Sequence, residues 1–196
     1  MLTTMIKLAV RLAFSLFVFT MPTWAFAAGP TLTVSGDGGL QIFDRDALLA
    51  RSDVVEITTS RDVAYRTPQT YRAVALAKLL EGVDVPPDAV VEAAAQDGFV
   101  TQLPRDLVYR NDGIKGYVAI EVAGKPWPPI PGKAKSAGPF YLVWVGPQAS
   151  SVPIMKWPYQ VVSLSVQRRR PGGGPCSRLI PRSLPSIRRE TAKPFS

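Results

Sequence analysis

The sequence predicts an α+β fold in which a mixed, mainly antiparallel β-sheet dominates and the helices are few and short. Short runs rich in β-branched and aromatic residues recur along the chain, separated by glycine, proline and aspartate, a pattern typical of strands and turns. Segments with helical spacing are fewer and shorter. Because the predicted strands outnumber the short helices, a doubly wound fold is disfavoured. A Rossmann fold is further disfavoured because no G-x-G-x-x-G motif follows a predicted strand.

The first elements form a hairpin followed by a helix. Strands at 31–35 and 39–43 are joined by glycine and aspartate, which suit the positive-φ positions of tight turns. Asp44 is the expected N-cap of a short helix over 45–50. Further strands are predicted at 53–60, 90–95, 99–103, 117–122, 140–145 and 160–166.

Three later segments complete the predicted organisation. The end of segment 64–80 has helical spacing, with apolar side chains at Val74, Ala77, Leu79 and Leu80. A third short helix is expected over 104–109, because proline is favourable in a first turn. The proline- and glycine-rich segment 125–138 is predicted to be a surface loop. The wholly apolar run 140–145 is expected to be central in its sheet.

Residues 1–27 are predicted to be a signal peptide. Lys7 and Arg11 precede an apolar run, and Ala25-Phe26-Ala27 fits the small-x-small rule for cleavage. An uncleaved anchor is the alternative, but the apolar run is shorter than the ~20 residues that a membrane-spanning helix needs. We therefore expect an exported protein, periplasmic or secreted, with no membrane span after cleavage.

Residues 28–166 are predicted to form one domain, and residues 167–196 a disordered basic tail. Arg, Pro, Gly and Ser dominate the tail, a composition that buries too little surface to offset its ordering entropy. A shifted reading frame in GC-rich DNA would encode the same bias, which is a second hypothesis for this segment. The domain has 13 Lys and Arg against 14 Asp and Glu, whereas the tail has eight against one. Because the positive charge lies outside the domain, we expect no nucleic-acid partner.

Two features of the composition exclude several kinds of site. The chain has no histidine, which excludes Ser-His-Asp and Cys-His catalytic arrangements and removes the commonest transition-metal ligand. It has one cysteine, Cys176, so neither an intrachain disulfide nor a C-x-x-C-H haem site can form. We therefore assign no catalytic residue and no metal ligand.

Between Val90 and Val166 the apolar runs alternate with a set of turn dipeptides: Asp97-Gly98, Gly124-Lys125, Gly138-Pro139 and Trp157-Pro158. The runs read VVEAAAQDGFVTQLPRDLV, GYVAIEVAGKPWPPIP, AGPFYLVWV and WPYQVVSLSV, and YRAVALAKLLEG precedes them. In order and spacing, segment 40–166 resembles the oxidoreductase molybdopterin-binding domain family. The resemblance implies the sulfite-oxidase-like fold and an oxidoreductase class.

In catalytic members of that family, a cysteine thiolate holds molybdenum in the loop before the helix that carries a Leu-Leu pair. The matching segment 60–74, SRDVAYRTPQTYRAV, contains no cysteine, and Cys176 follows the last predicted strand. The resemblance thus implies the fold rather than the cofactor, and we expect no cofactor; molybdopterin is the alternative. Arg61, Arg66 and Arg72 are candidate contacts for an anion such as a pterin phosphate, or else ordinary surface arginines.

Four other residues are candidates for binding. Asp97 and Gly98 lie at a strand end where a ligand could be contacted, although they also suit a simple hairpin turn. Trp127 and Trp157 stand beside prolines in loops, where they would form a partner-binding patch or cover the core. The nearby lysines, Lys133 and Lys135, are interpreted as solubilising residues.

The leading functional prediction is a non-catalytic or accessory member of a periplasmic redox system, which binds a partner or a small anionic ligand through the loops 61–72 and 125–138. The resemblance implies a c-type cytochrome or another periplasmic redox protein as the partner. One alternative is a true molybdopterin-dependent oxidoreductase whose metal is held without protein sulfur. The other is a non-redox anion- or peptide-binding module.

Overall fold

The computed structural model describes residues 29–168 of the chain. The predicted signal peptide and all but the first two residues of the predicted tail lie outside these residues. The described part is a mixed α+β structure dominated by antiparallel and mixed sheets with a few short helices, so the predicted fold class is confirmed. No helix in this part is long and apolar enough to cross a membrane.

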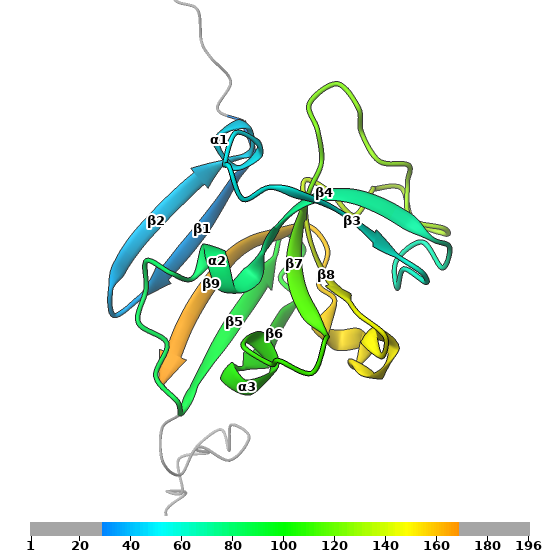
Figure 1. Ribbon diagram of the computed structural model, residues 1–196. Helices are drawn as coiled ribbons and strands as arrows, with labels where there is room; N and C mark the ends of the chain where they lie inside the picture. The colour runs from blue at the N-terminus through cyan, green and yellow to red at the C-terminus, as the bar shows by residue number, and fades with distance from the viewer. Residues whose placement is uncertain (1–28, 169–196) are drawn as a thin grey trace, which may run out of the picture.

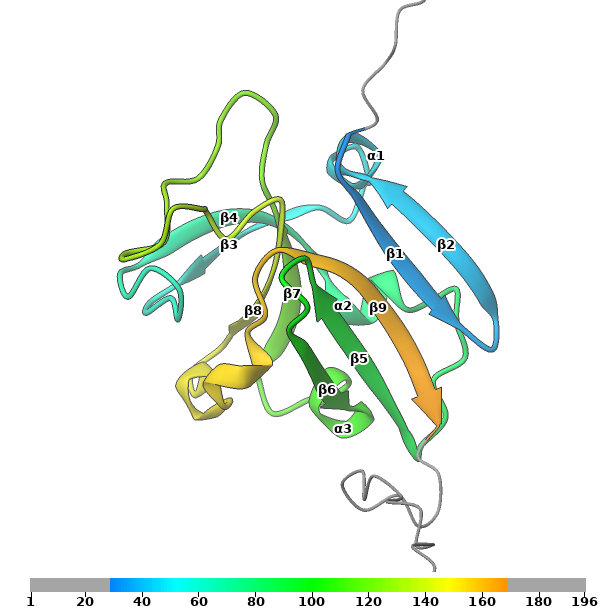
Figure 2. The ribbon, with the colours of Figure 1, turned by 180° about the vertical axis from the view of Figure 1, so that it is seen from behind.

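The first sheet has five strands in the order β2-β1-β9-β5-β6 (Figures 1 and 2). The strands are β1 (Thr31–Gly36), β2 (Gly39–Asp44), β5 (Ala89–Ala95), β6 (Val100–Pro104) and β9 (Val161–Arg168). β1 pairs in parallel with β9, and the other pairs are antiparallel. The predicted β1–β2 and β5–β6 hairpins are confirmed, and β9 continues two residues beyond the predicted end at Val166.

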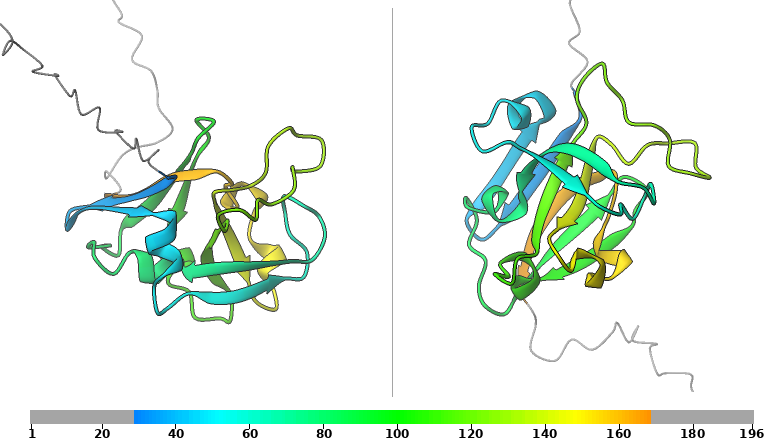
Figure 3. Two further views of the ribbon diagram at one scale, coloured as in Figure 1. Left: turned by 90° about the horizontal axis from the view of Figure 1, so that it is seen from above. Right: turned by 45° about the vertical axis from the view of Figure 1, so that its right-hand side comes forward.

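The second sheet has four antiparallel strands in the order β3-β4-β7-β8. These strands are β3 (Val55–Thr59), β4 (Gln69–Ala75), β7 (Lys115–Ile120) and β8 (Phe140–Val145). Buried side chains from both sheets form one apolar cluster, in which Val91 and Leu164 of the first sheet join Val118 and Leu142 of the second. The core therefore lies between the two sheets (Figure 3).

Three short helices connect the strands: α1 (Arg45–Leu49), α2 (Leu76–Leu79) and α3 (Arg105–Val108). Asp44 caps α1 as predicted, because its carboxylate accepts a hydrogen bond of 2.7 Å from the amide of Ala47. α1 contacts β2 of one sheet and β4 and β7 of the other, so it joins the two layers at one end of the molecule.

The predicted helix at the end of segment 64–80 is mostly wrong. Residues 69–75 form strand β4, and only one helical turn, α2, follows before Gly82. In β4, Tyr71 and Ala73 are buried while Thr70 and Arg72 are exposed, which is the alternation of a strand. Pairing with β3 and β7 on both sides stabilises this strand, a long-range effect that outweighs the local helical spacing.

The predicted central position of residues 140–145 is also wrong. β8 is an edge strand, although all but its last side chain are buried. Its free edge is covered by a later segment, because Tyr141 forms a bridge with Tyr159 and the amide of Leu142 donates to the carbonyl of Pro158 at 3.0 Å. Burial of an apolar strand therefore does not require a strand on each side.

Three connecting segments that position the candidate site lie on the side of the molecule opposite β2 (Figure 1). They are the β3–β4 loop at 60–68, the long β7–β8 loop at 121–139, and the segment 146–160, which contains two 3-10 turns, η1 (Ala149–Ser151) and η2 (Ile154–Lys156). The predicted surface loop at 125–138 is part of the second of these.

Candidate functional site

The β3–β4 loop is organised by one buried carboxylate, that of Asp62, which is 1% exposed. Its Oδ1 accepts hydrogen bonds from the amides of Ala64 at 2.8 Å and Tyr65 at 2.9 Å. The hydroxyl of Tyr71 donates to Oδ2 at 3.0 Å, and the hydroxyl of Tyr141 donates to Oδ1 at 3.3 Å. Both carboxylate oxygens are thereby satisfied inside the protein, as burial of a charge requires.

The tyrosines around Asp62 have raised pKa values. Burial raises the pKa of Tyr71 and of Tyr141 far above the usual range, and the negative charge of Asp62 raises both further. Burial likewise raises the pKa of Tyr65, whose hydroxyl donates to the carbonyl of Pro128 and accepts from the amide of Ala137, each at 3.0 Å. These phenols therefore act as neutral hydrogen-bonding groups. Tyr71 and Tyr141 hold the β3–β4 loop onto β4 and β8, and Tyr65 ties it to the β7–β8 loop.

The loop fixes Arg66 in an unusual backbone conformation. Arg66 has φ of 62°, the left-handed region that non-glycine residues seldom adopt. The amide of Arg66 donates to the carbonyl of Asp62 at 2.8 Å, and the amide of Asp62 donates to the carbonyl of Thr67 at 3.1 Å. These two bonds hold the backbone there, and the exposed side chain of Arg66 is placed at the edge of a cavity.

The β7–β8 loop is held by a second carboxylate, that of Glu121. Its Oε1 accepts from the amide of Trp127 at 2.7 Å and from the hydroxyl of Ser136 at 3.1 Å. Gly138 leaves room for this carboxylate, since a Cβ at that position would lie 2.5 Å from Cδ of Glu121. The loop is thereby closed at its base, while its outer part, 130–133, faces the cavity.

The cavity has a volume of about 350 Å³ and is hereafter called the loop cavity. It is lined by residues from 63–66, from the β5–β6 turn, from 130–133 of the β7–β8 loop, and from 154–159. Most of the wall is apolar, and its larger side chains are Phe99, Ile130, Ile154, Met155, Trp157 and Tyr159. The combination of an apolar wall with a few polar groups is typical of small-molecule sites.

Three charged side chains line the loop cavity: Arg66, Asp97 and Lys133. None of the three takes part in an ion pair within residues 29–168. Lys133 lies over the ring of Tyr159, with Nζ 4.5 Å from the ring centroid, and also contacts the Tyr159 hydroxyl. The loop cavity therefore offers two cations and one anion around an apolar floor.

The predicted site residues are only partly brought together. Arg66 and Asp97 line the same cavity, although they are far apart in the sequence. Arg61 lies instead at a separate cavity of about 300 Å³, with Thr58 and Ser150. Arg72 is farther along β4, where its Nη2 donates to the carbonyl of Leu49 at 3.1 Å. The three arginines therefore do not form one anion site.

The predicted turn at Asp97 and Gly98 is confirmed. Gly98 has φ of 86°, and the amide of Phe99 donates to Oδ1 of Asp97 at 3.0 Å. Asp97 lines the loop cavity as well, so this residue both forms the turn and faces the space that a ligand would occupy.

The two tryptophans belong to the core rather than to an exposed patch. Trp157 is 4% exposed, and its Nε1 donates to the carbonyl of Val152 at 3.2 Å. Trp127 is half-buried and packs edge-on against Tyr71, with ring centroids 4.8 Å apart. Lys133, interpreted from sequence as a solubilising residue, lies at the loop cavity instead.

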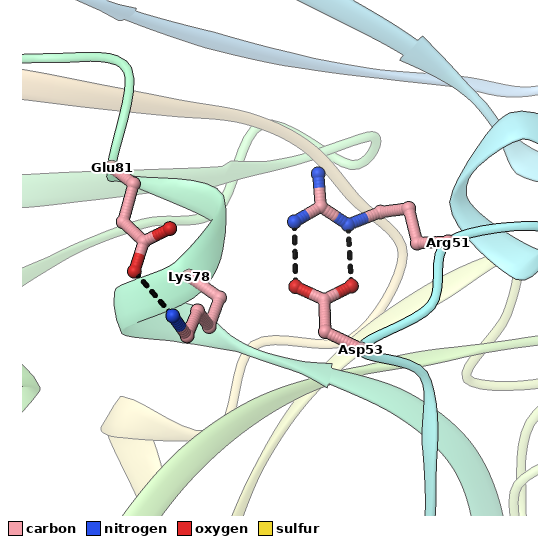
Figure 4. Close-up of polar contacts among 4 residues, drawn as sticks. All are labelled: Arg51, Asp53, Lys78 and Glu81. Carbon is pink, nitrogen blue, oxygen red and sulfur yellow. Dashed lines mark hydrogen bonds and ion pairs between the residues drawn. The ribbon is translucent and has the colours of Figure 1, made fainter.

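Charged residues also gather near α1 and α2, where they are paired with each other (Figure 4). Arg51 binds Asp53 in a bidentate manner, with distances of 2.7 and 2.6 Å, and Lys78 binds Glu81 at 2.6 Å. The Arg51 guanidinium lowers the pKa of the Asp53 carboxyl through these hydrogen bonds. Because each charge already has its counter-ion, this cluster is a structural feature rather than a ligand site.

A third hollow, of about 540 Å³, lies along the starts of β1 and β9. The described residues in its wall include Thr31, Thr33, Gln160 and Ser163, and none of them is charged. It begins at Gly29, the first residue that the structure describes. The loop cavity is therefore the better-defined candidate.

The residues around the β3–β4 loop do not fit molybdenum held as in the resembling family. The segment 60–74 supplies hydroxyls and one carboxylate, and Asp62 and Tyr71 are already bonded to each other inside the core. A soft thiolate is absent from this segment. Within the part of the chain that the structure describes, no three His, Cys, Asp or Glu side chains are grouped so that they could hold a metal ion.

Comparison with models of protein families and with curated proteins found no match to this chain.

The residues that hold the two loops in place are not among those predicted from the sequence: Asp62, Tyr71, Tyr141 and Glu121. A weak signal exists for Tyr71, because the alternation in QTYRAVA marks its side chain as inward-facing. No local pattern distinguishes Asp62 or Glu121 from solvent-exposed acids. The hydroxyls that complete the bonding of Asp62 come from β4 and β8, and Ser136, which donates to Glu121, is 15 residues away in the same loop.

Proposed function

We propose that this protein is an exported, non-catalytic binding protein of the sulfite-oxidase-like molybdopterin-binding fold, which takes a small ligand with an anionic group and an apolar body in the loop cavity. The observation that carries the proposal is the junction of the segments 63–66 and 130–133, which line one cavity and each contribute a cation that forms no ion pair within residues 29–168. An accessory role in a periplasmic redox system, beside a c-type cytochrome or similar protein, is the biological setting that we propose for it.

The organisation of the β3–β4 loop supports a binding role over a catalytic one. Its buried polar groups are engaged with one another, because Asp62 is bonded to Tyr71, to Tyr141 and to backbone amides. A rigid loop of this kind is suited to positioning the Arg66 side chain. Charge-assisted hydrogen bonds from such a guanidinium favour an anionic ligand.

Binding of anilinonaphthalene sulfonate, an aromatic anion that fluoresces in apolar sites, tests the proposal. We expect the full chain, expressed with its own N-terminal segment, to bind this probe. Arg66→Ala and Lys133→Ala should each weaken binding by about tenfold, which corresponds to about 1.4 kcal/mol for one lost charge-assisted bond.

Arg61→Ala is the matched control, because Arg61 is exposed in the same loop but lies at a different cavity. Circular dichroism and thermal unfolding must show that each variant is folded, since the probe also binds loosely packed states. Equal affinities for the Arg61 and Arg66 variants would contradict the proposed site. Metal analysis of periplasmically expressed protein tests the non-catalytic role, which stoichiometric molybdenum would overturn.

A further inference from the structure

The loop cavity presents charges of both signs. The ligand that fits it best can therefore be specified more closely than as a molecule with an anionic group and an apolar body. An anion alone would meet Arg66 and Lys133 favourably but would lie near the like charge of Asp97. A cation alone would meet Asp97 favourably but would lie near two like charges. Only a ligand that carries a positive and a negative group can pair with cavity charges of both signs.

Arg66 is the group best placed to bind a carboxylate. Its guanidinium has no hydrogen-bond or ion-pair partner among residues 29–168, whereas the ammonium of Lys133 is already in contact with the Tyr159 hydroxyl. The planar fork of a guanidinium matches the two oxygens of a carboxylate. Its backbone is held in place by the bond from its amide to the carbonyl of Asp62.

Asp97 is the group that would receive an ammonium. Its Oδ1 is occupied by the amide of Phe99 at 3.0 Å, which fixes the side chain at the turn. Within the described part of the chain, no donor is bonded to Oδ2. The carboxylate therefore keeps one oxygen available while its orientation is set by the other.

The remaining surface of the cavity is suited to an apolar side chain. Phe99, Ile154 and Met155 are large apolar residues that line it and are 37%, 74% and 65% exposed. Trp157 forms a buried wall beneath them. The volume of about 350 Å³ lies at the lower end of the range of ~300–1,000 Å³ found for ligand pockets, which favours a single small molecule.

We propose that the loop cavity binds free amino acids with apolar side chains, as zwitterions. The ligand carboxylate pairs with Arg66, its ammonium pairs with Asp97, and its side chain packs on Met155 and Trp157. This assignment rests on the proposed function, because it specifies the ligand of the same cavity.

Three ligands that each carry a phenyl ring test the assignment. They are phenylalanine, its analogue phenylpropionate, which lacks the ammonium, and its analogue phenethylamine, which lacks the carboxylate. Isothermal titration of the full chain measures each affinity. We expect phenylalanine to bind at least about tenfold more tightly than either analogue, a difference of about 1.4 kcal/mol or more, because each analogue lacks one charge-assisted bond.

Asp97→Asn identifies the group that selects the ammonium. The asparagine oxygen can still accept the bond from Phe99, so the turn is preserved while the negative charge is removed. We expect phenylalanine and phenylpropionate to bind this variant within about twofold of each other. Asp112→Asn is the matched control, because Asp112 also accepts from an amide two residues on, that of Ile114, but does not line the cavity.

The outcomes separate this inference from the proposed function. If phenylpropionate binds the unmodified protein as tightly as phenylalanine, or if Asp97→Asn keeps the preference, the zwitterion assignment is wrong and anion binding stands. If none of the three ligands nor the fluorescent anion binds the folded protein, both proposals fail.

Discussion

A single carboxylate, that of Asp62, determines the shape of the loop that carries Arg66. The amides that it accepts from are two and three residues away, so they define a local turn. The hydroxyls that complete its hydrogen bonding belong to Tyr71 and Tyr141, which are nine and 79 residues away. Its burial is therefore a tertiary property, even though the turn it forms is local.

Tyr71→Phe tests this arrangement. The substitution removes the donor to Oδ2 of Asp62 and leaves a buried charged oxygen without that bond. We expect the free energy of unfolding to fall by about 1.5–3 kcal/mol, the usual value for a hydrogen bond to a charged group. Urea denaturation measures the change.

Tyr117→Phe is the comparison for that experiment, because Tyr117 is half-buried in the neighbouring strand and makes no side-chain hydrogen bond within residues 29–168. Its unfolding free energy should change by no more than about 0.5 kcal/mol. Similar losses in the two variants would mean that the bond to Asp62 contributes nothing specific.

At the scale of elements, the strands can be predicted from the sequence more readily than the way in which the connecting segments close. The strands β5, β6, β7, β8 and β9 overlap the segments that the sequence predicts to be strands. The β7–β8 loop, in contrast, contains four prolines between 125 and 138, and its closure depends on Glu121 and on the space left by Gly138. A glycine that accommodates a side chain from the opposite end of a long loop has no signature in the residues next to it.

Gly138→Ala is predicted to destabilise the β7–β8 loop. The added Cβ would lie 2.5–2.7 Å from the Glu121 carboxylate and would displace it from Trp127 and Ser136. We expect a loss of about 1–3 kcal/mol in unfolding free energy and weaker binding of the fluorescent anion.

A double-mutant cycle with Glu121→Ala identifies the cause. If the clash is with Glu121, Gly138→Ala should cost clearly less in the Glu121→Ala background than in the unmodified protein. Additive costs would show that the alanine disturbs some other contact.

At the scale of the whole molecule, two sheets share one core. The loop cavity is lined mainly by the segments that connect the strands. The parallel pair β1–β9 joins the first and the last described strands, so the N-terminal hairpin becomes part of the same sheet as the C-terminal strand. The charges of the domain nearly balance, and most ion pairs are local in sequence. Stability of the whole is therefore expected to come from the core, with small contributions from ion pairs.

We expect the pH dependence of unfolding to reflect the ion pair between Arg51 and Asp53. The Arg51 guanidinium lowers the pKa of Asp53 below its ordinary value of 3.8, so the pair stabilises the folded protein above that pH. The contribution is lost as the pH falls through the lowered pKa, because the carboxyl is then protonated in both states.

We expect Asp53→Asn to cost about 1 kcal/mol or less at neutral pH, and the difference from the unmodified protein to vanish in strong acid. Unfolding in urea at several pH values measures this. Asp37→Asn, in the more exposed pair with Arg168, should show a smaller difference at every pH. A difference for Asp53→Asn that persists unchanged in strong acid would exclude the ion pair as its source.

The amino-acid sequence by itself determined the fold class, the hairpins, the cap of α1 and the Asp97-Gly98 turn, because each depends on residues within a few positions of one another. Only the tertiary structure decided that residues 69–75 form a strand, that β8 lies at an edge, and that Arg66 and Asp97 meet at one cavity while Arg61 and Arg72 lie elsewhere. These outcomes depend on pairing and packing between distant segments, which the local patterns of the chain do not specify.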